Sequence, residues 1–257
     1  RDAGSRTMLQ FMQQLQALGY LVKFWPDNLA YDPEYTPQLQ VMGVEVFHGP
    51  AWKGKFEKLL KEQEAGLSAV LLSRPHIARH YFDAVHRHSH ARVVYYGHDL
   101  HFQRLLQQSE ATGDVKLARE AERVRKLEFD AWKQSHVVLY PSADEAAAVR
   151  GLAPGVDARA VPPYCFPEFE SGARPEGRRG VLFVAGFGHP PNVDAACWLH
   201  GLVMPLVRAQ VPDVALELVG SSPTATVRAL SDSCTEVSGY VTDAELAERY
   251  ARSRVAV

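Results

Sequence analysis

Residues 181–194 read VLFVAGFGHPPNVD, and residues 211–221 read VPDVALELVGS. The apolar runs 181–185 and 215–219 predict two buried strands, and the periodic segment 193–210 between them predicts a helix. A strand, a glycine-rich turn, a helix and a second strand form a βαβ unit, which is typical of parallel sheets. The unit follows a stretch rich in proline and glycine, which is the composition of a linker. The sequence therefore indicates that a second domain begins near residue 181.

The first part of the chain also alternates predicted strands with predicted helices. Strands are expected at 20–25, 44–47, 69–73, 92–96, 137–140 and 158–161, and helices at about 5–18, 56–64, from 75, 113–134 and 144–151. This alternation predicts a doubly wound parallel sheet, as in α/β proteins. We therefore expect two Rossmann-like domains facing a cleft: an N-terminal domain at 1–165, a linker at 166–180, and a C-terminal domain from 181 to 257.

The two ends of the sequence read as interior segments of such domains. The opening RDAGS resembles a loop that leads into a helix, and the closing VAV resembles the start of a strand. We expect the first strand of the N-terminal domain to precede residue 1, and the C-terminal domain to be incomplete at residue 257.

Composition is that of a globular protein. The chain has 257 residues, 46% of them hydrophobic and 23% charged, with a net charge of −2. This balance gives no indication of nucleic-acid binding, and no apolar run approaches the roughly 18 residues that would span a bilayer. The three cysteines lie far apart, which favours a reduced, cytoplasmic location. Peripheral contact with the inner face of a membrane stays open.

Ligands of open parallel sheets bind at the carboxyl ends of the strands, so the segments that follow predicted strands are the candidates for chemistry. These segments are residues 4, 73–74, 97–99, 141–142, 186–192, 220–222 and 239–241.

The sharpest candidate in the first domain is the Gly97-His98-Asp99 segment. A histidine at a strand end can donate to a sugar hydroxyl or act at the reaction centre, and Asp99 can orient it or face a second substrate. The alternative is that Asp99 caps a helix beside a solvated His98.

In the second domain the candidate is the turn from Gly186 to Asn192. Glycines allow a ligand to approach the backbone, and the helix N-terminus that follows favours phosphate. The alternative is a tight turn with Asn192 as a helix cap. The turn is neither a phosphate-binding P-loop nor a full dinucleotide fingerprint, because no Gly-Lys-Ser/Thr follows and Pro191 takes the place of the last glycine.

Two other polar patterns predict solvated faces rather than sites. His86, His88 and His90 alternate near His76 and His80, without a cluster of cysteines or carboxylates that would indicate a metal site. We expect no metal and no resident cofactor. The charged run 119–126 lies on the predicted long helix and is expected to face solvent.

In four places the chain resembles family 4 glycosyltransferases, which have the two-Rossmann-domain glycosyltransferase B fold. The matching segments are Asp2 to Arg6, Tyr96 to Leu100, Gly186 to Asp194, and the succession 218–221, 237–241 and 245–246. The third is similar to a Gly-Phe-x-His-x-Pro-Asn turn of bacterial members that build surface polysaccharides. The segments occur in the family's order over essentially the whole chain.

This resemblance implies a retaining transferase that moves a sugar from a nucleoside-diphosphate donor to a glycan or lipid-linked acceptor without an obligatory metal. It implies that His98 contacts the transferred sugar and that Asp99 supports His98 or the acceptor. The residues implied to bind the donor are Gly4, Gly186, Gly188, His189, Asn192, Gly220, Ser221, Tyr240 and Val241.

Two departures from the family pattern keep alternatives open. Many members place an arginine and a lysine in the turn at 186–192, where this chain has only His189 and Asn192. The family's paired glutamates would follow Val257. A nucleotide-sugar epimerase of the same fold and a non-catalytic, degenerate transferase module are therefore the alternatives. A dehydrogenase fits less well, because Val219 leads into Gly220 and Ser221 without an acidic residue.

Overall fold

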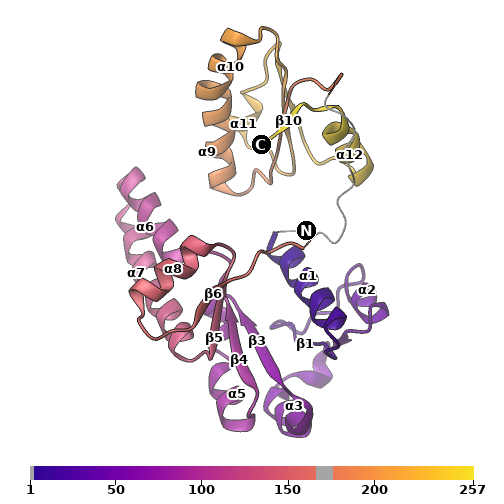
Figure 1. Ribbon diagram of the computed structural model, residues 1–257, viewed down its shortest axis with the longest axis vertical. Helices are drawn as coiled ribbons and strands as arrows, with labels where there is room; N and C mark the ends of the chain where they lie inside the picture. The colour runs from indigo at the N-terminus through magenta and orange to yellow at the C-terminus, as the bar shows by residue number, and fades with distance from the viewer. Residues whose placement is uncertain (1–2, 166–175) are drawn as a thin grey trace. The chain divides into compact units, whose positions relative to one another are not determined.

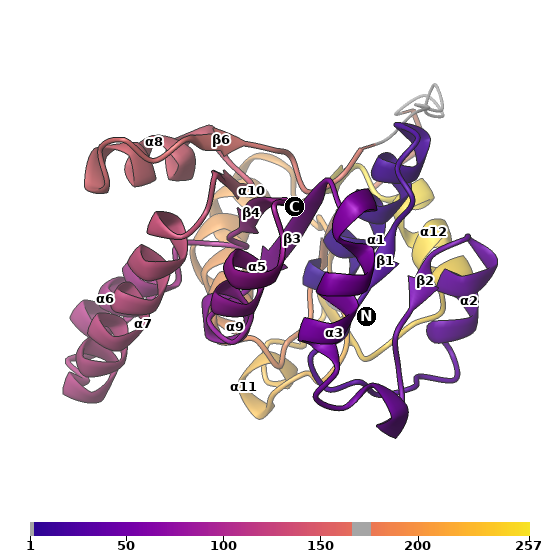
Figure 2. The same ribbon diagram turned by 90° about the horizontal axis from the view of Figure 1, so that it is seen from below.

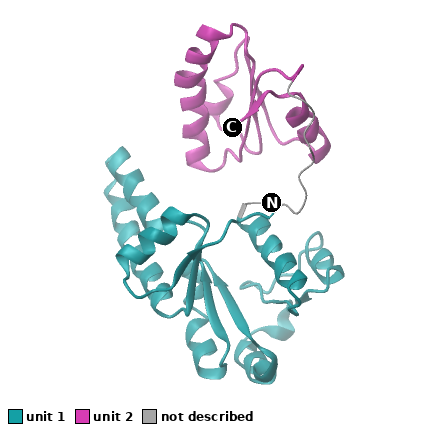
Figure 3. Ribbon diagram, viewed as in Figure 1, with its two compact units in different colours: residues 1–167 teal, residues 168–257 magenta. Residues whose placement is uncertain are grey.

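The computed structural model describes residues 3–165 and 176–257. The chain divides into two compact units, Arg1–Pro167 and Glu168–Val257, which are coloured separately in Figure 3. Each unit has its own parallel sheet and its own buried core. The predicted α/β class with parallel sheets is thereby confirmed. Most of the predicted linker, residues 166–175, lies outside the described residues.

The main sheet of unit 1 has four parallel strands in the order β3-β4-β5-β6. They are β3 (Ala69–Ser73), β4 (Arg92–Tyr96), β5 (Val137–Tyr140) and β6 (Ala158–Ala160). Their register pairs Ser73 with Tyr96 and Tyr96 with Leu139, so the carboxyl ends of β3, β4 and β5 lie at one edge. All four apolar runs had been predicted as strands.

A second, two-stranded parallel sheet in unit 1 joins β1 (Lys23–Phe24) and β2 (Glu45–Val46). The prediction of one continuous sheet was wrong here, and so was the prediction of a buried strand from residue 20. The backbone N–H of Tyr20 still bonds the carbonyl of Leu15 around Gly19, whose φ is +89°. Because the first helix closes with this turn, the strand begins only at Lys23, and Leu21 is exposed.

Eight helices of unit 1 surround these sheets in the described residues (Figure 1). They are α1 (Ala3–Ala17), α2 (Thr36–Val41), α3 (Phe56–Gln63), α4 (Pro75–Ala78), α5 (Phe82–His88), α6 (His101–Thr112), α7 (Val115–Lys133) and α8 (Ala143–Leu152), with 3-10 turns at Pro50–Trp52 and Glu64–Gly66.

Helices α6 and α7 form an antiparallel pair, seen side by side in Figures 1 and 2. Gly113 ends α6 in the left-handed conformation, with φ of +71°, and Asp114 caps α7 by accepting the N–H of Lys116 at 2.8 Å. The sequence predicted only the second of these helices, because α6 has a weak apolar pattern rich in glutamine. The turn that was expected to begin one helix instead connects two.

The sheet of unit 2 has the strand order β10-β7-β8-β9, with all neighbours parallel. The strands are β7 (Val181–Val184), β8 (Leu216–Val219), β9 (Thr235–Ser238) and β10 (Val255–Ala256). The first strand in sequence lies between the second and the fourth, which is the reversal of strand order found in Rossmann-like sheets. In open α/β sheets, ligands bind beside such a reversal, which here is at the carboxyl ends of β7 and β10.

The helix that follows β7 is continuous but changes pitch. It consists of α9 (Pro190–Trp198), one π-helical turn (Leu199–Val203) and α10 (Met204–Gln210). Pro205 cannot donate to the preceding turn and crowds the carbonyl four residues earlier, so a wider turn just before it relieves the clash. Two shorter connections, α11 (Ala225–Arg228) and α12 (Asp243–Arg252), complete the unit.

None of the helices described in residues 3–165 and 176–257 combines the length and apolarity needed to cross a membrane.

Candidate functional site

The carboxyl edge of the main sheet in unit 1 brings together two of the predicted segments. His98 follows β4 and is hydrogen-bonded through Nε2 to the Oγ of Ser73, the last residue of β3, at 2.8 Å. The ring of Tyr96 meets the His98 ring edge-on, with centroids 5.0 Å apart. His98 is half-buried, so its ring is held in place while part of it stays accessible.

Gly97 makes this arrangement possible. The ring of Tyr140, at the end of β5, lies where a β-carbon on residue 97 would be. Tyr140 is fully buried, and its hydroxyl accepts a hydrogen bond from Nε1 of Trp132 at 3.1 Å. The backbone before His98 can therefore approach the neighbouring strand only because residue 97 has no side chain.

Asp99 is engaged by two cations that follow it in the chain. One carboxylate oxygen lies 2.8 Å from Nδ1 of His101, and the other accepts from Nε of Arg104 at 2.8 Å. Burial opposes ionisation, but the ion pair with His101 and the hydrogen bond from Arg104 outweigh it and lower the pKa of Asp99 to about 2. Asp99 is thus an ion-paired carboxylate, which suits it to hold the loop and not to accept a proton.

His101 is the counterpart of this ion pair. Burial alone would favour its neutral form, but Asp99 and the carboxylate of Glu128 raise the pKa of His101 to about 9. Glu128 lies on α7 and is 0% exposed. Its two oxygens accept the backbone N–H groups of His101 at 3.3 Å and Phe102 at 3.2 Å.

Sequence reasoning did not single out Glu128 or His101. The run 119–126 was read as a solvated face, and its ion pairs Arg123–Glu120 and Arg125–Glu122 are indeed exposed. Glu128, however, follows the buried Ala121 by seven residues, which places it on the same helical face. A glutamate at a position of the apolar stripe was the signal that could have identified it.

The turn after β3 is strained. Arg74 has φ of +66°, a conformation that costs a non-glycine residue of order 1 kcal/mol, and its carbonyl accepts the N–H groups of Ile77 and Ala78 at the start of α4. Burial and the charges of Arg74 and His101 lower the pKa of the neighbouring His76. This turn directly follows Ser73, the hydrogen-bond partner of His98.

In unit 2 the predicted turns after β7 and β8 lie together. The N–H of Phe187 donates to the carbonyl of Ser221 at 2.9 Å, and Nδ2 of Asn192 donates to the carbonyl of Gly186 at 2.8 Å. Gly220 has φ of +153°, and a β-carbon there would overlap the carbonyl of Ala185. Gly220 is thus needed for the contact between the two turns.

The N-terminus of α9 offers fewer amides than a helix of that length normally does. Pro190 and Pro191 are its first residues and have no N–H, and the N–H of Asn192 is bonded to the carbonyl of His189 at 3.0 Å. His189, not Asn192, is the residue at the cap position. An anion at this turn would have to use other donors.

The remaining predicted donor-binding residues of unit 2 differ in exposure. Gly186, Gly188, His189 and Ser221 are exposed, Val241 is half-buried, and Tyr240 is 77% exposed. A β-carbon at Gly186 or Gly188 would meet only ordinary contacts, so these two glycines are not required by packing. Both glycines follow β7, whose carboxyl end lies at the same edge of the sheet as that of β9, the strand before Tyr240.

Gly4 does not lie in a loop, as had been predicted. It belongs to the first turn of α1, which begins at Ala3. The apolar face of that helix reaches the site instead, since Phe11 packs edge-on against Tyr96 with centroids 4.8 Å apart.

Each of the alternating histidines has a different interaction partner. Nε2 of His88 lies 3.1 Å from Glu57, Nε2 of His90 lies 3.3 Å from Glu64, and Nε2 of His86 lies 2.9 Å from the carbonyl of Gln134. In the part of the chain that the structure describes, no three histidine, cysteine or acidic side chains gather in a way that would hold a metal ion.

Comparison with known proteins gave likenesses among solved structures alone. No family model matches the chain, and no curated protein matches it. Among solved structures, the chain is similar to one described as the glycotransferase of kitacinnamycin, at 16% sequence identity and a TM-score of 0.43, covering 98% of this chain and 71% of the other. The likeness is too distant to assign a family or an activity.

Proposed function

We propose that this protein is a retaining glycosyltransferase of family 4 type, acting on a nucleoside-diphosphate sugar and on a hydroxyl of a glycan or lipid-linked acceptor in the cytoplasm. The observation that carries the proposal is the Ser73–His98 pair, fixed at the carboxyl edge of the unit 1 sheet. The reversal of strand order in the unit 2 sheet, with a glycine turn after its first strand, supports the proposal, because sheets of this kind bind nucleotides at such a reversal.

In the proposed reaction, the bond between the sugar and the diphosphate breaks and negative charge develops on the departing phosphate. The acceptor hydroxyl attacks from the same face and transfers its proton to that phosphate oxygen. His98 would contact a hydroxyl of the transferred sugar, and its fixed ring would lower the entropic cost of reaching the transition state. Asp99, ion-paired with His101 and Arg104, would keep the loop in place.

The donor phosphates would lie near Gly188, Ser221 and Asn192, and the base near Tyr240 and Val241. Because Pro190 and Pro191 remove two amide donors from the α9 terminus, the helix dipole alone would attract the phosphates there. Side chains and backbone N–H groups of the neighbouring turns, including that of Gly220–Ser222, would have to provide the direct hydrogen bonds.

The same scarcity of donors favours a second candidate, a non-catalytic module that keeps the fold without transferring a sugar. Neither arginine nor lysine occurs in residues 185–192. A module of this kind would bind no nucleoside diphosphate with useful affinity, whereas a transferase must do so.

Calorimetry separates these two candidates. UDP, GDP, dTDP and ADP are titrated into the full-length protein, with and without EDTA. Selective binding of one diphosphate that EDTA does not weaken is expected for a metal-independent transferase, and it identifies the donor base. If none of the four binds, the module is the better description.

His98→Ala tests the residue on which the proposal depends. With the donor found by calorimetry, the substitution should lower turnover strongly and leave nucleotide affinity nearly unchanged, because His98 lies in unit 1. His90→Ala is the matched control, since that histidine is exposed and pairs with Glu64, away from the Ser73–His98 pair. Turnover that is unaltered in His98→Ala would remove the assigned role.

A further inference from the structure

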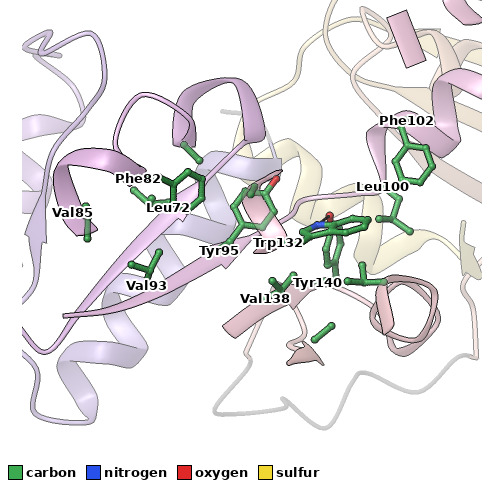
Figure 4. Close-up of a cluster of buried hydrophobic side chains, with 14 of the residues drawn as sticks. Leu72, Phe82, Val85, Val93, Tyr95, Leu100, Phe102, Trp132, Val138 and Tyr140 are labelled. Atoms are coloured by element: carbon green, nitrogen blue, oxygen red, sulfur yellow. Dashed lines mark hydrogen bonds between the residues drawn. The ribbon is translucent and has the colours of Figure 1, made fainter. Parts of the chain in front are cut away.

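Helix α7 holds the segment that contains His98 from two points on its buried face. Glu128 and Trp132, one helical turn apart, are both fully buried. Figure 4 shows Trp132 beside Tyr140, with Leu100 and Phe102 on the neighbouring segment. Both α7 side chains contact groups that determine where the backbone from Gly97 to Phe102 runs.

Trp132 acts on the beginning of this segment. Its indole N–H donates to the hydroxyl of Tyr140, which orients the tyrosine ring. That ring in turn fills the space beside Gly97. The position of Gly97 is therefore determined by the Tyr140 ring, which Trp132 on α7 holds in place.

Glu128 acts on the end of the segment. Helix α6 has Leu100 at its cap position and lacks a side-chain cap of its own. The Glu128 carboxylate takes that place from another helix, accepting the first two N–H groups of α6, from His101 and Phe102. An anion at a helix N-terminus also interacts favourably with the helix dipole.

The same carboxylate fixes the charge of His101. Nδ1 of His101 lies 3.6 Å from Glu128 and 2.8 Å from Asp99, and Asp99 also pairs with Arg104. Among the described residues, the charged and titratable groups around the imidazole and its carboxylates include Asp99 in the loop, Glu128 on α7, Arg104 on α6, His76 on α4 and Tyr95 on β4. Without Glu128, the imidazolium would keep one carboxylate, which it shares with Arg104.

Compared with apolar side chains of the same volume, a complete buried ion pair adds little net stability, because removing two charges from water costs about as much as their attraction returns, whereas loss of one partner alone is destabilising. Its effect is geometric: two backbone N–H groups and one imidazolium must meet one carboxylate, and a single loop conformation satisfies all three. We propose that Glu128 is a positioning residue, which acts through the α6 N-terminus and His101 to hold His98 against Ser73. This inference rests on the proposed function for the role of His98.

The test is Glu128→Gln, which keeps the side-chain volume and one acceptor oxygen but loses the charge. Glu122→Gln is the matched control, since Glu122 is on the same helix, exposed, and 3.6 Å from Arg125. The first readout is NMR of protein labelled with ¹⁵N-histidine, which reports the tautomer and titration of individual rings and requires no substrate. His98→Ala and His101→Gln spectra assign the two resonances.

We expect Glu128→Gln to shift the ¹⁵N resonances of the His98 ring away from their wild-type values and to make His101 titrate at a lower pH. Glu122→Gln should change neither. The proposal is overturned if Glu128→Gln is folded and both histidines keep the wild-type resonances. Should Glu128→Gln fail to fold, His101→Gln takes its place, because it leaves the carboxylate bonded to the two N–H groups, and unchanged His98 resonances there count against the proposal.

The second readout is steady-state kinetics with the donor found by calorimetry. A displaced catalytic group can cost on the order of 100-fold in rate, so Glu128→Gln should lower kcat by at least about tenfold and leave KM for the donor within about twofold. Equal loss in kcat and rise in KM would indicate general damage and contradict the positioning role. A wild-type protein without transferase activity would reject the proposed function, and the NMR result would still decide the structural claim.

Discussion

The ring of Tyr140 occupies the position that a β-carbon on Gly97 would take. Two adjacent strands thus approach at the residue before His98, and neither partner has room to move, because Tyr140 is fully buried and bonded to Trp132. The close approach of β4 and β5 at this point gives the segment after β4 its direction.

Gly97→Ala should therefore destabilise the protein by about 1–3 kcal/mol, the usual cost of extra volume in a filled core. The free energy of unfolding in urea measures this. Gly151→Ala is the control, because a β-carbon at that helical position meets nothing within 4 Å and alanine should stabilise α8 by about 0.5 kcal/mol. Equal stability of Gly97→Ala and wild type would mean that Tyr140 can leave its place.

His101 should make stability depend on alkaline pH. Its pKa is raised from 6.5 to about 9 in the folded protein. The folded state therefore keeps a proton that the unfolded state loses at a lower pH. The stabilisation is complete below pH 6.5 and disappears as the pH rises through 9. His101→Gln should therefore cost on the order of 2 kcal/mol at pH 6 and much less at pH 10. Urea unfolding of both proteins at these two values is the measurement, and a difference that does not change with pH would contradict the ion pair.

Ser73→Ala should affect turnover more than folding. It removes the hydrogen bond to Nε2 of His98, and one such bond is worth about 1 kcal/mol, which is about fivefold in kcat. Affinity for the nucleoside diphosphate, measured by calorimetry, should stay the same. Ser109→Ala, which removes a bond to the carbonyl of Asp114 at the end of α6, is the control that should leave kcat unchanged. A kcat for Ser73→Ala equal to that of the control would show that the pair is not used.

Gly220→Ala should destabilise unit 2 more than any other glycine substitution in its turns. A β-carbon there would overlap a backbone carbonyl, that of Ala185, and the residue has φ of +153°, so the cost should reach about 3 kcal/mol. Gly239→Ala, with open space around the new carbon, should remain within about 0.5 kcal/mol of wild type. Fluorescence of Trp198, the tryptophan of unit 2, follows this unit during urea unfolding; similar midpoints for the two variants would argue against the close contact.

Gly188→Ala separates a packing role from a binding role. The new β-carbon would be 4.0 Å from Ser222, an ordinary contact, so stability should be unchanged. If the donor phosphate approaches this backbone as proposed, affinity for the diphosphate should fall by about tenfold, or 1.4 kcal/mol. Calorimetry with the variant gives the answer, and full affinity would place the phosphates elsewhere.

Much of the fold could be predicted because its strands are continuous apolar runs, such as 69–73 and 181–184, that only a sheet covered on both faces can bury. The helices α6 and α2 escaped prediction since their residues are mostly polar and their position depends on contacts with α7 and β2. The order of strands and the division of unit 1 into two sheets depend on pairings between distant segments, which local pattern does not encode.

The residues of the candidate site that directly follow a strand could be predicted, whereas those on the buried face of a helix could not. His98 and Gly220 were found from their place after apolar runs. The partner of His98, Ser73, was among the residues selected by the same rule, but the hydrogen bond between them required the register of β3 and β4. Glu128 lies 30 residues beyond His98 in sequence, and only the packing of α7 brings it to the loop.

The small size of the β1–β2 sheet implies that unit 1 unfolds locally at this sheet before it unfolds as a whole. Two strands of two residues each offer few protected amides, and a two-stranded sheet depends on side-chain packing for its stability. We expect hydrogen exchange to begin there, well before the amides of β4 and β5, whose side chains Tyr95 and Val138 are wholly buried. The segment after β1 ends in Asp27, which accepts the hydroxyl proton of Tyr81 beyond β3. Local unfolding of β1 and β2 would thus break the bond between Asp27 and Tyr81 while β4 and β5 keep their structure, so one edge of unit 1 would exchange its amides independently of the other.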